Sequence, residues 1–301
     1  MSKKPTLTLQ GRYKIETFGP DGELRTSLDW FENLITNAGL DLFSGDAVTG
    51  YSGSYLYHAP TKYCYVGTSA TAPAVTDTQL GALVGTSPAG SQGASINNVA
   101  DRRMEVTTTY TFDVGAATGN LSEIGVGPIA TKLFSRALIK DGAGSPTTIT
   151  VLADESLRVT YEVRINIPTT TFVSVVDGYT FNIKAVNADG NGSPIPTTNL
   201  ASTRDWWFSY AGAVGATIDD QPAGSAIASI MPVVDTYVLS SYTITAVVAA
   251  GLGDTNGNIA SMKWRLGPIP WQASVSPVIA KDDTKLLNLT FGISWAREGE
   301  L

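Results

Sequence analysis

The alternation of apolar and polar residues is the strongest pattern along this chain. In residues 103–112 every apolar side chain has the same parity, and Arg, Glu and Thr fill the other positions. Residues 157–165 alternate in the same way. A period of two places the apolar side chains on one face of a β-strand. With two shorter β-like runs between them, at residues 120–127 and 133–139, these segments predict an antiparallel meander over residues 102–167.

The N-terminal segment predicts a hairpin followed by a helix. Residues 6–28 form two β-like arms around a Gly-Pro-Asp-Gly turn, whose Pro and Gly supply the backbone angles of a tight turn. Residues 29–43 predict a helix, because their apolar side chains recur at helical spacing and Asp29 with Glu32 resembles a capping box. The apolar stripe of this predicted helix consists of Phe31, Leu34, Ile35, Ala38 and Leu42.

The segment before the meander is less regular. Residues 44–61 and 85–100 lack periodicity, so we predict a long loop for the first and a mobile surface loop for the second. Between them, residues 62–67 predict a short strand, and residues 77–84 predict one or two helical turns.

A weak internal repeat follows the meander. Within residues 172–186, residues 179–186 alternate again, and residues 187–198 are rich in turn residues, which predicts a linker. The meander pattern then recurs, which predicts a second, related β-unit; the alternative is that any two antiparallel meanders look alike. Residues 241–248 resemble the strand that ends at Phe112, residues 257–267 resemble residues 119–127, and residues 278–295 resemble residues 151–165.

Composition agrees with a folded chain of strands and turns. The 301 residues are 43% hydrophobic and 16% charged, with 30 glycines and abundant Thr, Ser and Val. We therefore predict an all-β fold of two antiparallel β-sandwich-like units, with an internal duplication as one origin, an N-terminal β-hairpin and one short helix. The predicted domains are residues 1–44 (hairpin and helix), 45–190 (first β-sandwich unit) and 191–301 (second β-sandwich unit).

Charge and residue counts narrow the classes of function. A net charge of -7 argues against nucleic acid, because phosphate binding depends on clustered Lys and Arg. Cys64 is the only cysteine and His58 the only histidine, which excludes an intrachain disulfide, a multi-cysteine metal site and a histidine pair. Neither a secretory signal nor an apolar run of roughly 18 to 20 residues is visible. We expect no nucleic-acid partner, no membrane, no metal and no cofactor.

Acidic residues are candidates for chemistry. A glycosidase holds two carboxylates across a sugar, and acidic pairs occur at residues 154–155, 219–220 and 282–283. Two of these pairs stand in the turn before a long strand, where solvated charge is the structural explanation. Residues 254–258 space oxygen side chains like the first half of a calcium loop, but the later Glu is missing and a hairpin turn explains them equally. We expect no catalytic residue.

An aromatic run at residues 205–210 is the strongest candidate for binding. On a strand, three of its aromatic side chains would line one face and Trp207 the other. The run has three interpretations: part of a core, a contact between subunits, or a platform on which a sugar stacks. The candidate contact residues are Trp206, Trp207, Phe208 and Tyr210.

Several short motifs along the chain resemble, by their order and combination, motifs of structural proteins of tailed bacteriophages. Asn-Leu-Ile-Thr-Asn-Ala-Gly-Leu-Asp at residues 33–41 precedes Tyr-Val-Gly-Thr at residues 65–68 and the segment 73–80. The resemblance covers roughly the first 170 residues, and it rests on the order and combination of the motifs. It continues with Leu-Ser-Glu-Ile-Gly-Val-Gly at residues 121–127, Ser-Arg-Ala-Leu-Ile at residues 135–139 and the segment 150–162.

This resemblance implies a virion protein without catalytic activity, from the tail, baseplate, collar or fibre-associated components. Its partners would be copies of itself in a symmetric oligomer and other virion proteins, assembled in the cytoplasm of the host bacterium. The glycine repeats and heptads of an extended fibre are absent, which favours a compact adaptor, collar or fibre-anchoring subunit. The alternative is a carbohydrate-binding or host-receptor-binding module of a tail fibre or spike, which would contact a host surface glycan.

Overall fold

The structure is a computed structural model, and it confirms the all-β fold. It describes residues 4–44, 60–98, 101–186, 206–216, 220–235, 237–266 and 269–300. These residues form twenty strands and one short helix. Residues 45–59 of the predicted loop at residues 44–61, which include His58, and the predicted linker at residues 187–198 lie outside the described residues.

The chain forms two compact units whose boundaries differ from the expected ranges 1–44, 45–190 and 191–301. The first unit comprises Leu9–Ile96, Glu105–Ile165 and Arg297–Leu301. The second unit comprises Met1–Thr8, Asn97–Met104 and Asn166–Ala296. Each unit therefore draws on segments that are far apart in the sequence.

The first unit begins with the predicted hairpin, of β1 (Thr6–Phe18) and β2 (Leu24–Glu32). The predicted helix at residues 29–43 is wrong in its first half, because β2 continues to Glu32 with Phe31 paired to Tyr13. Helix α1 spans only Asn37–Phe43, and the side chain of Thr36 accepts a hydrogen bond from the Gly39 amide at its start. Cross-strand pairing thus overrides the helical spacing of the apolar residues.

Strand pairing in the first unit overturns two further predictions. The strands follow the order β1-β11-β6-β5-β4-β8-β9-β3, with β2 also paired to β1. Strand β5 spans Leu83–Asn98, where we predicted helical turns up to residue 84 and a loop over residues 85–100. This Gly-rich and Ser-rich segment has no apolar period of its own, and its pairing with β4 stabilises it as a strand. The other strands are β3 (Leu34–Ile35), β4 (Tyr63–Gly67), β6 (Arg103–Phe112), β8 (Glu123–Gly127), β9 (Ser135–Leu138) and β11 (Ser156–Asn166), with β7 (Gly119–Leu121) and β10 (Ile149–Val151) forming a small separate pair.

Three tyrosines fill the core of the first unit. Tyr13, Tyr110 and Tyr161 are fully buried, and the rings of Tyr13 and Tyr161 lie 4.7 Å apart. Each hydroxyl has a partner: Tyr13 shares a hydrogen bond of 2.8 Å with Ser135, Tyr110 donates to the Thr61 carbonyl, and Tyr161 accepts from Asn33. Because buried hydroxyls need such partners, these hydrogen bonds allow the three tyrosines to be fully buried.

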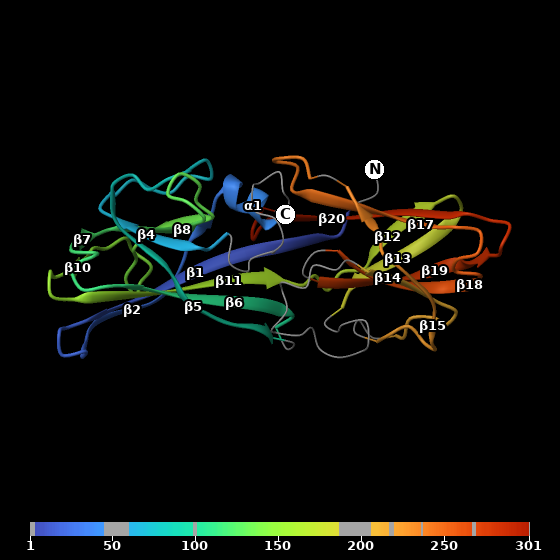
Figure 1. Cartoon of the computed structure of the whole chain (residues 1–301), viewed down its shortest axis with the longest axis horizontal. Helices are drawn as coiled ribbons and strands as arrows, with labels where there is room; N and C mark the ends of the chain where they lie inside the picture. Colours follow the sequence, from blue (N-terminus) through green and yellow to red (C-terminus); the bar gives the residue numbers. More distant parts are fainter. Residues whose placement is uncertain are drawn as a thin grey trace. The chain divides into compact units, whose positions relative to one another are not determined.

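The second unit contains two sheets (Figure 1). One sheet has six strands in the order β12-β13-β19-β18-β14-β15. In the other, β17 lies between β16 and β20. The six strands are β12 (Phe172–Val176), β13 (Tyr179–Ala185), β19 (Ile269–Lys281), β18 (Gly257–Leu266), β14 (Trp206–Tyr210) and β15 (Ala226–Ile230); the others are β16 (Val233–Val234), β17 (Thr243–Ala250) and β20 (Leu287–Arg297).

The strand pairing of the two units reproduces the predicted repeat. Gly119 pairs with Val151 in the first unit and Gly257 with Lys281 in the second, and both glycines have positive φ, 138° and 148°. Strand β14 pairs with β18 as β4 pairs with β8. The pairing of β14 with β15 shifts register between Ser209 and Tyr210, and the pairing of β4 with β5 shifts register at the equivalent residues, Val66 and Gly67. The repeat therefore extends beyond the segments that sequence alone aligned.

The two units differ in one long strand. In the first unit, β5 pairs with both β4 and β6 and so joins the two halves of the fold. In the second unit the equivalent place is taken by two strands, β15 and β16, with Met231 and Pro232 between them. Proline has no amide hydrogen for a sheet, so the sheets of the second unit separate here.

Candidate functional site

The aromatic run lies on β14, inside the second unit. Trp207 is 0% exposed and Tyr210 is 7% exposed, so neither presents a ring face to solvent. Phe208 is half-buried, and the side chain of Trp206 is outside the described part of the chain. The run therefore contributes mainly to the interior of this unit. The strand face that carries Trp207 is the one that lies beside a cleft.

Trp207 belongs to a row of three tryptophans that crosses three neighbouring strands. It pairs with Trp264 on β18, which pairs in turn with Trp271 on β19. The indole nitrogens of all three are buried without a hydrogen-bond partner. A buried indole N–H normally finds an acceptor, and leaving one unmatched costs about 1–3 kcal/mol. The row is therefore a concentration of unused hydrogen-bond donors.

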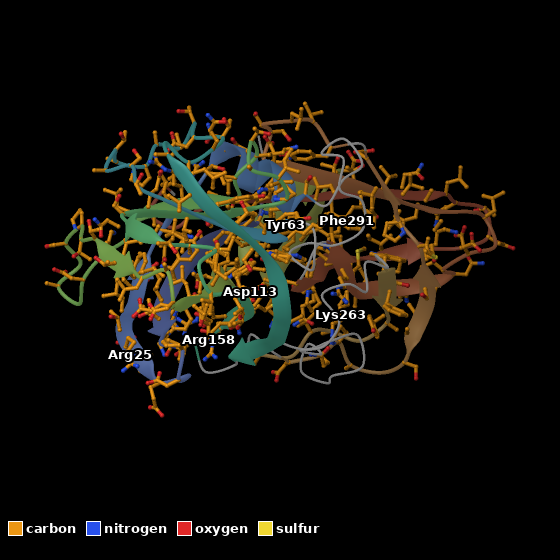
Figure 2. The ribbon with its side chains drawn as sticks, turned by 60° about the vertical axis from the view of Figure 1, so that its left-hand side comes forward. Arg25, Tyr63, Asp113, Arg158, Lys263 and Phe291 are labelled. Atoms are coloured by element: carbon orange, nitrogen blue, oxygen red, sulfur yellow. The ribbon has the colours of Figure 1, made fainter. Side chains whose placement is uncertain are left out.

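An apolar cleft of about 460 Å³ opens beside this row. Its lining comes from the six-stranded sheet on one side and from β17 and β20 on the other, the two sheets that Figure 2 marks with Lys263 and Phe291. Trp264 and Phe291 contact each other from the two sides, with ring centroids 5.1 Å apart. Several apolar lining residues remain half-buried instead of buried: Phe181, Ile183, Leu289 and Phe291.

The rim of the cleft is polar and carries one kind of charge. Lys4 is the only charged side chain among the described lining residues. Ser174, Thr245, Asn288 and Thr290 add neutral polar groups. With apolar walls and an ammonium group at its rim, the cleft is suited to an apolar molecule that carries an anionic group.

The first unit carries an ionic cluster on the other face of the equivalent strands, because Arg136 follows Ser135 and Glu123 lies three residues before Val126. The Glu123 carboxylate is fully buried and accepts hydrogen bonds from the amides of Ser69, Gly81 and Ala82, at 2.7–3.2 Å. It also accepts two from the guanidinium of Arg136, at 2.8 and 3.0 Å. Arg136 pairs with Asp77 at 2.6 Å as well. The donors and acceptors of this cluster satisfy one another, so it fastens the loop at residues 68–82 to β8 and β9.

The second unit repeats this fastening with neutral groups. Ser261, at the position equivalent to Glu123, donates to the Gly212 carbonyl, and Gln272, equivalent to Arg136, donates to the Asp220 carbonyl at 2.6 Å. Both carbonyls belong to the connection between β14 and β15. The polar residues at these positions in both units thus hold a loop, which is a structural role.

The remaining acidic candidates act in turns. Glu155 accepts a hydrogen bond from the Leu152 amide at 2.9 Å, and Asp254 accepts one from the Gly251 amide at 3.0 Å. Asp282 pairs with Lys285 and accepts a hydrogen bond from the Thr284 amide, and these contacts hold the pKa of its carboxyl below the usual range. Asp219 lies outside the described residues. These carboxylates occupy separate turns of the chain.

The thiol and the possible metal ligands are the remaining candidates. Cys64 is fully buried, and burial raises the pKa of its thiol, which disfavours the reactive thiolate. The described residues include no group of three or more His, Cys, Asp or Glu that could hold a metal ion, and their helix is too short to cross a membrane. Comparison of the chain with protein-family models, with curated proteins and with solved structures finds no match.

Proposed function

We propose that this chain is a non-enzymatic structural component of a tailed bacteriophage virion, a tail, collar or fibre-anchoring subunit that assembles as a symmetric oligomer. The sequence motifs that resemble such proteins support the proposal, and so does the use of the acidic residues in turns and in a buried cluster. The observation that carries it is the apolar edge of the second unit.

That edge is strand β12, which ends the six-stranded sheet of the described residues. Its sequence, Phe-Val-Ser-Val-Val, has no charge, and three of its four apolar residues are exposed, with Val175 at 66%. The short edge strand β16 is similar, with Val233 71% exposed. Monomeric proteins protect such edges with charge, proline or bulges, because a bare edge pairs with other chains. An edge of this kind is expected on a subunit of an assembly.

The first test is the state of the purified chain in solution. We expect a defined oligomer in light scattering coupled to size-exclusion chromatography, and dissociation to monomer when Val175→Lys places a charge on β12. Leu252→Lys is the matched control, since Leu252 is an exposed apolar residue in the turn between β17 and β18. A monomer at every concentration, together with absence of the chain from purified particles by mass spectrometry, contradicts the proposal.

The second candidate is a carbohydrate-binding or host-receptor-binding module. The half-buried Phe208 and the aromatic cleft favour it, whereas the burial of Trp207 and Tyr210 counts against a sugar platform on β14. A glycan array separates the two candidates. Specific glycan binding that Phe208→Ala abolishes supports the module, and an array without binding supports the structural subunit.

A further inference from the structure

We infer that the cleft of the second unit is a binding site for a small amphipathic carboxylate, with an apolar body between the two sheets and a carboxylate near the rim. This inference is independent of the proposed assembly. It rests on the size of the cleft, on the kinds of polar group that line it and on its contrast with the first unit.

The size and lining of the cleft fit an apolar body. Its volume of about 460 Å³ lies in the range of about 300–1,000 Å³ typical of small-molecule sites. The wall is formed by aromatic and aliphatic side chains of both sheets, and Phe181, Leu289 and Phe291 keep part of their surface exposed there. Covering that surface with an apolar chain removes it from water, which is the main favourable contribution to such binding.

The charge at the rim fits an anionic group. Trp207 and Trp264 line the cleft, but their indole nitrogens are buried from solvent and do not face it. The donor that lines the cleft is the Lys4 ammonium, which carries a positive charge and can only donate. Because no acidic side chain is among the described lining residues, nothing there repels an anion. A carboxylate is the common group that accepts from such donors and complements a cation.

The first unit shows what this fold looks like when the same place is filled. There the row equivalent to the three tryptophans is Cys64, Val126 and Ser135, and the buried tyrosine Tyr13 bonds to Ser135. No orphaned indole occurs in that row. The tryptophan row and the cleft beside it are therefore a property of the sequence of the second unit and not a requirement of the shared strand pairing.

The test is a titration of the full chain with dodecanoate below its micelle-forming concentration, followed by calorimetry and by tryptophan fluorescence. We expect saturable binding of one dodecanoate per chain with a change in the emission of the tryptophans. Dodecanol, which keeps the apolar chain and lacks the charge, should bind more weakly. Absence of saturable binding, or many weak sites per chain, overturns the inference.

Two variants and one control locate the site. Leu289→Glu puts a negative charge into the cleft and should weaken dodecanoate binding at least tenfold, whereas Lys4→Glu should weaken dodecanoate several-fold and leave dodecanol unchanged. Leu286→Glu, at a side chain that is 66% exposed and does not line the cleft, is the control with the same charge. Circular dichroism of each variant shows whether it is folded.

The competing occupant is an apolar segment of a second copy. If Leu289→Glu disrupts the oligomer and leaves dodecanoate binding intact, a second chain occupies the cleft and the inference is wrong. If it abolishes dodecanoate binding and leaves the oligomer intact, the inference stands, whatever the Val175→Lys experiment shows about assembly.

Discussion

The two units build one pattern of strand pairing around opposite kinds of interior. In the first unit the strands β4, β8 and β9 contribute the small residues Cys64, Val126 and Ser135, and buried tyrosines fill the space with every hydroxyl bonded. In the second unit the equivalent row is three tryptophans, and a cleft remains beside it. The same pattern of backbone pairing is therefore compatible with side chains that differ in volume and in hydrogen bonding.

The two units also differ in the polar side chains that hold a loop against the sheet. The first unit uses a buried carboxylate and guanidinium, and the second uses a serine and a glutamine at the equivalent positions. A buried ion pair holds a unique geometry only while both partners are present, since either charge alone is left in a poor solvent. The buried ion pair therefore fixes the position of the loop in the first unit. The second unit, which uses neutral groups, should lose less stability when one of them is replaced.

The largest expected effect is at this fastening. Arg136→Met leaves the Glu123 carboxylate buried without its guanidinium and should destabilise the first unit by about 3–5 kcal/mol. Gln272→Met at the equivalent position should cost the second unit only about 1–3 kcal/mol. Urea unfolding followed by hydrogen exchange and mass spectrometry assigns each loss to a unit. Equal losses would remove the distinction between ionic and neutral fastening.

Alkaline pH should separate the units next. Burial raises the pKa of Tyr13, Tyr110 and Tyr161 in the folded first unit above their unfolded value. Their contribution to stability is complete below the unfolded pKa of about 10 and is lost as the pH rises from there through the folded pKa. We expect hydrogen exchange to accelerate first in the first unit, and Tyr161→Phe to reduce this dependence. Earlier opening of the second unit would contradict the assignment.

A smaller loss of stability is expected when Val126 of the first unit is replaced by the residue type at the equivalent position of the tryptophan row. Val126→Trp places in the first unit the side chain that stands at Trp264 in the second. Because the space is already filled by tyrosines, this overpacking should cost about 1–3 kcal/mol, measured by urea denaturation. The control is Val126→Ile, which adds a single methylene. A neutral Val126→Trp would show that the first unit also has room for a cleft.

Filling the cleft should have the smallest effect, and of opposite sign. Val176 lines the cleft and is partly exposed, so Val176→Phe should stabilise the second unit by about 0.5–2 kcal/mol and compete with dodecanoate. Thermal unfolding with and without dodecanoate measures both. Val173→Phe, on the same edge strand but outside the cleft lining, serves as the comparison.

Some of the fold could be predicted because its signal is local. Strict alternation located β6 and β11, and a Gly-Pro-Asp-Gly turn located the hairpin of β1 and β2. Strand β5 was missed because its glycines and serines carry no apolar period, and its order comes from pairing with β4. The first half of the predicted helix was wrong because β1 offered those residues a partner, and tertiary contacts outweigh weak helical preference.

The cleft itself had only a partial signal in the sequence. The aromatic run singled out β14, and alternation placed Trp207 on a face of its own. Nothing local connected Trp207 to Trp264, to Phe291 or to Lys4, because they are brought together by the packing of distant strands.

The sequence by itself determined that this protein is built from strands, where most of them lie, and that a meander recurs in its second half. Those properties follow from the period of apolar residues, which each segment carries within itself. Only the tertiary structure decided which strands pair, which unit holds a loop with a buried ion pair, and which keeps a cleft beside three tryptophans. These depend on side-chain volumes and hydrogen-bond partners that meet across long distances in the chain.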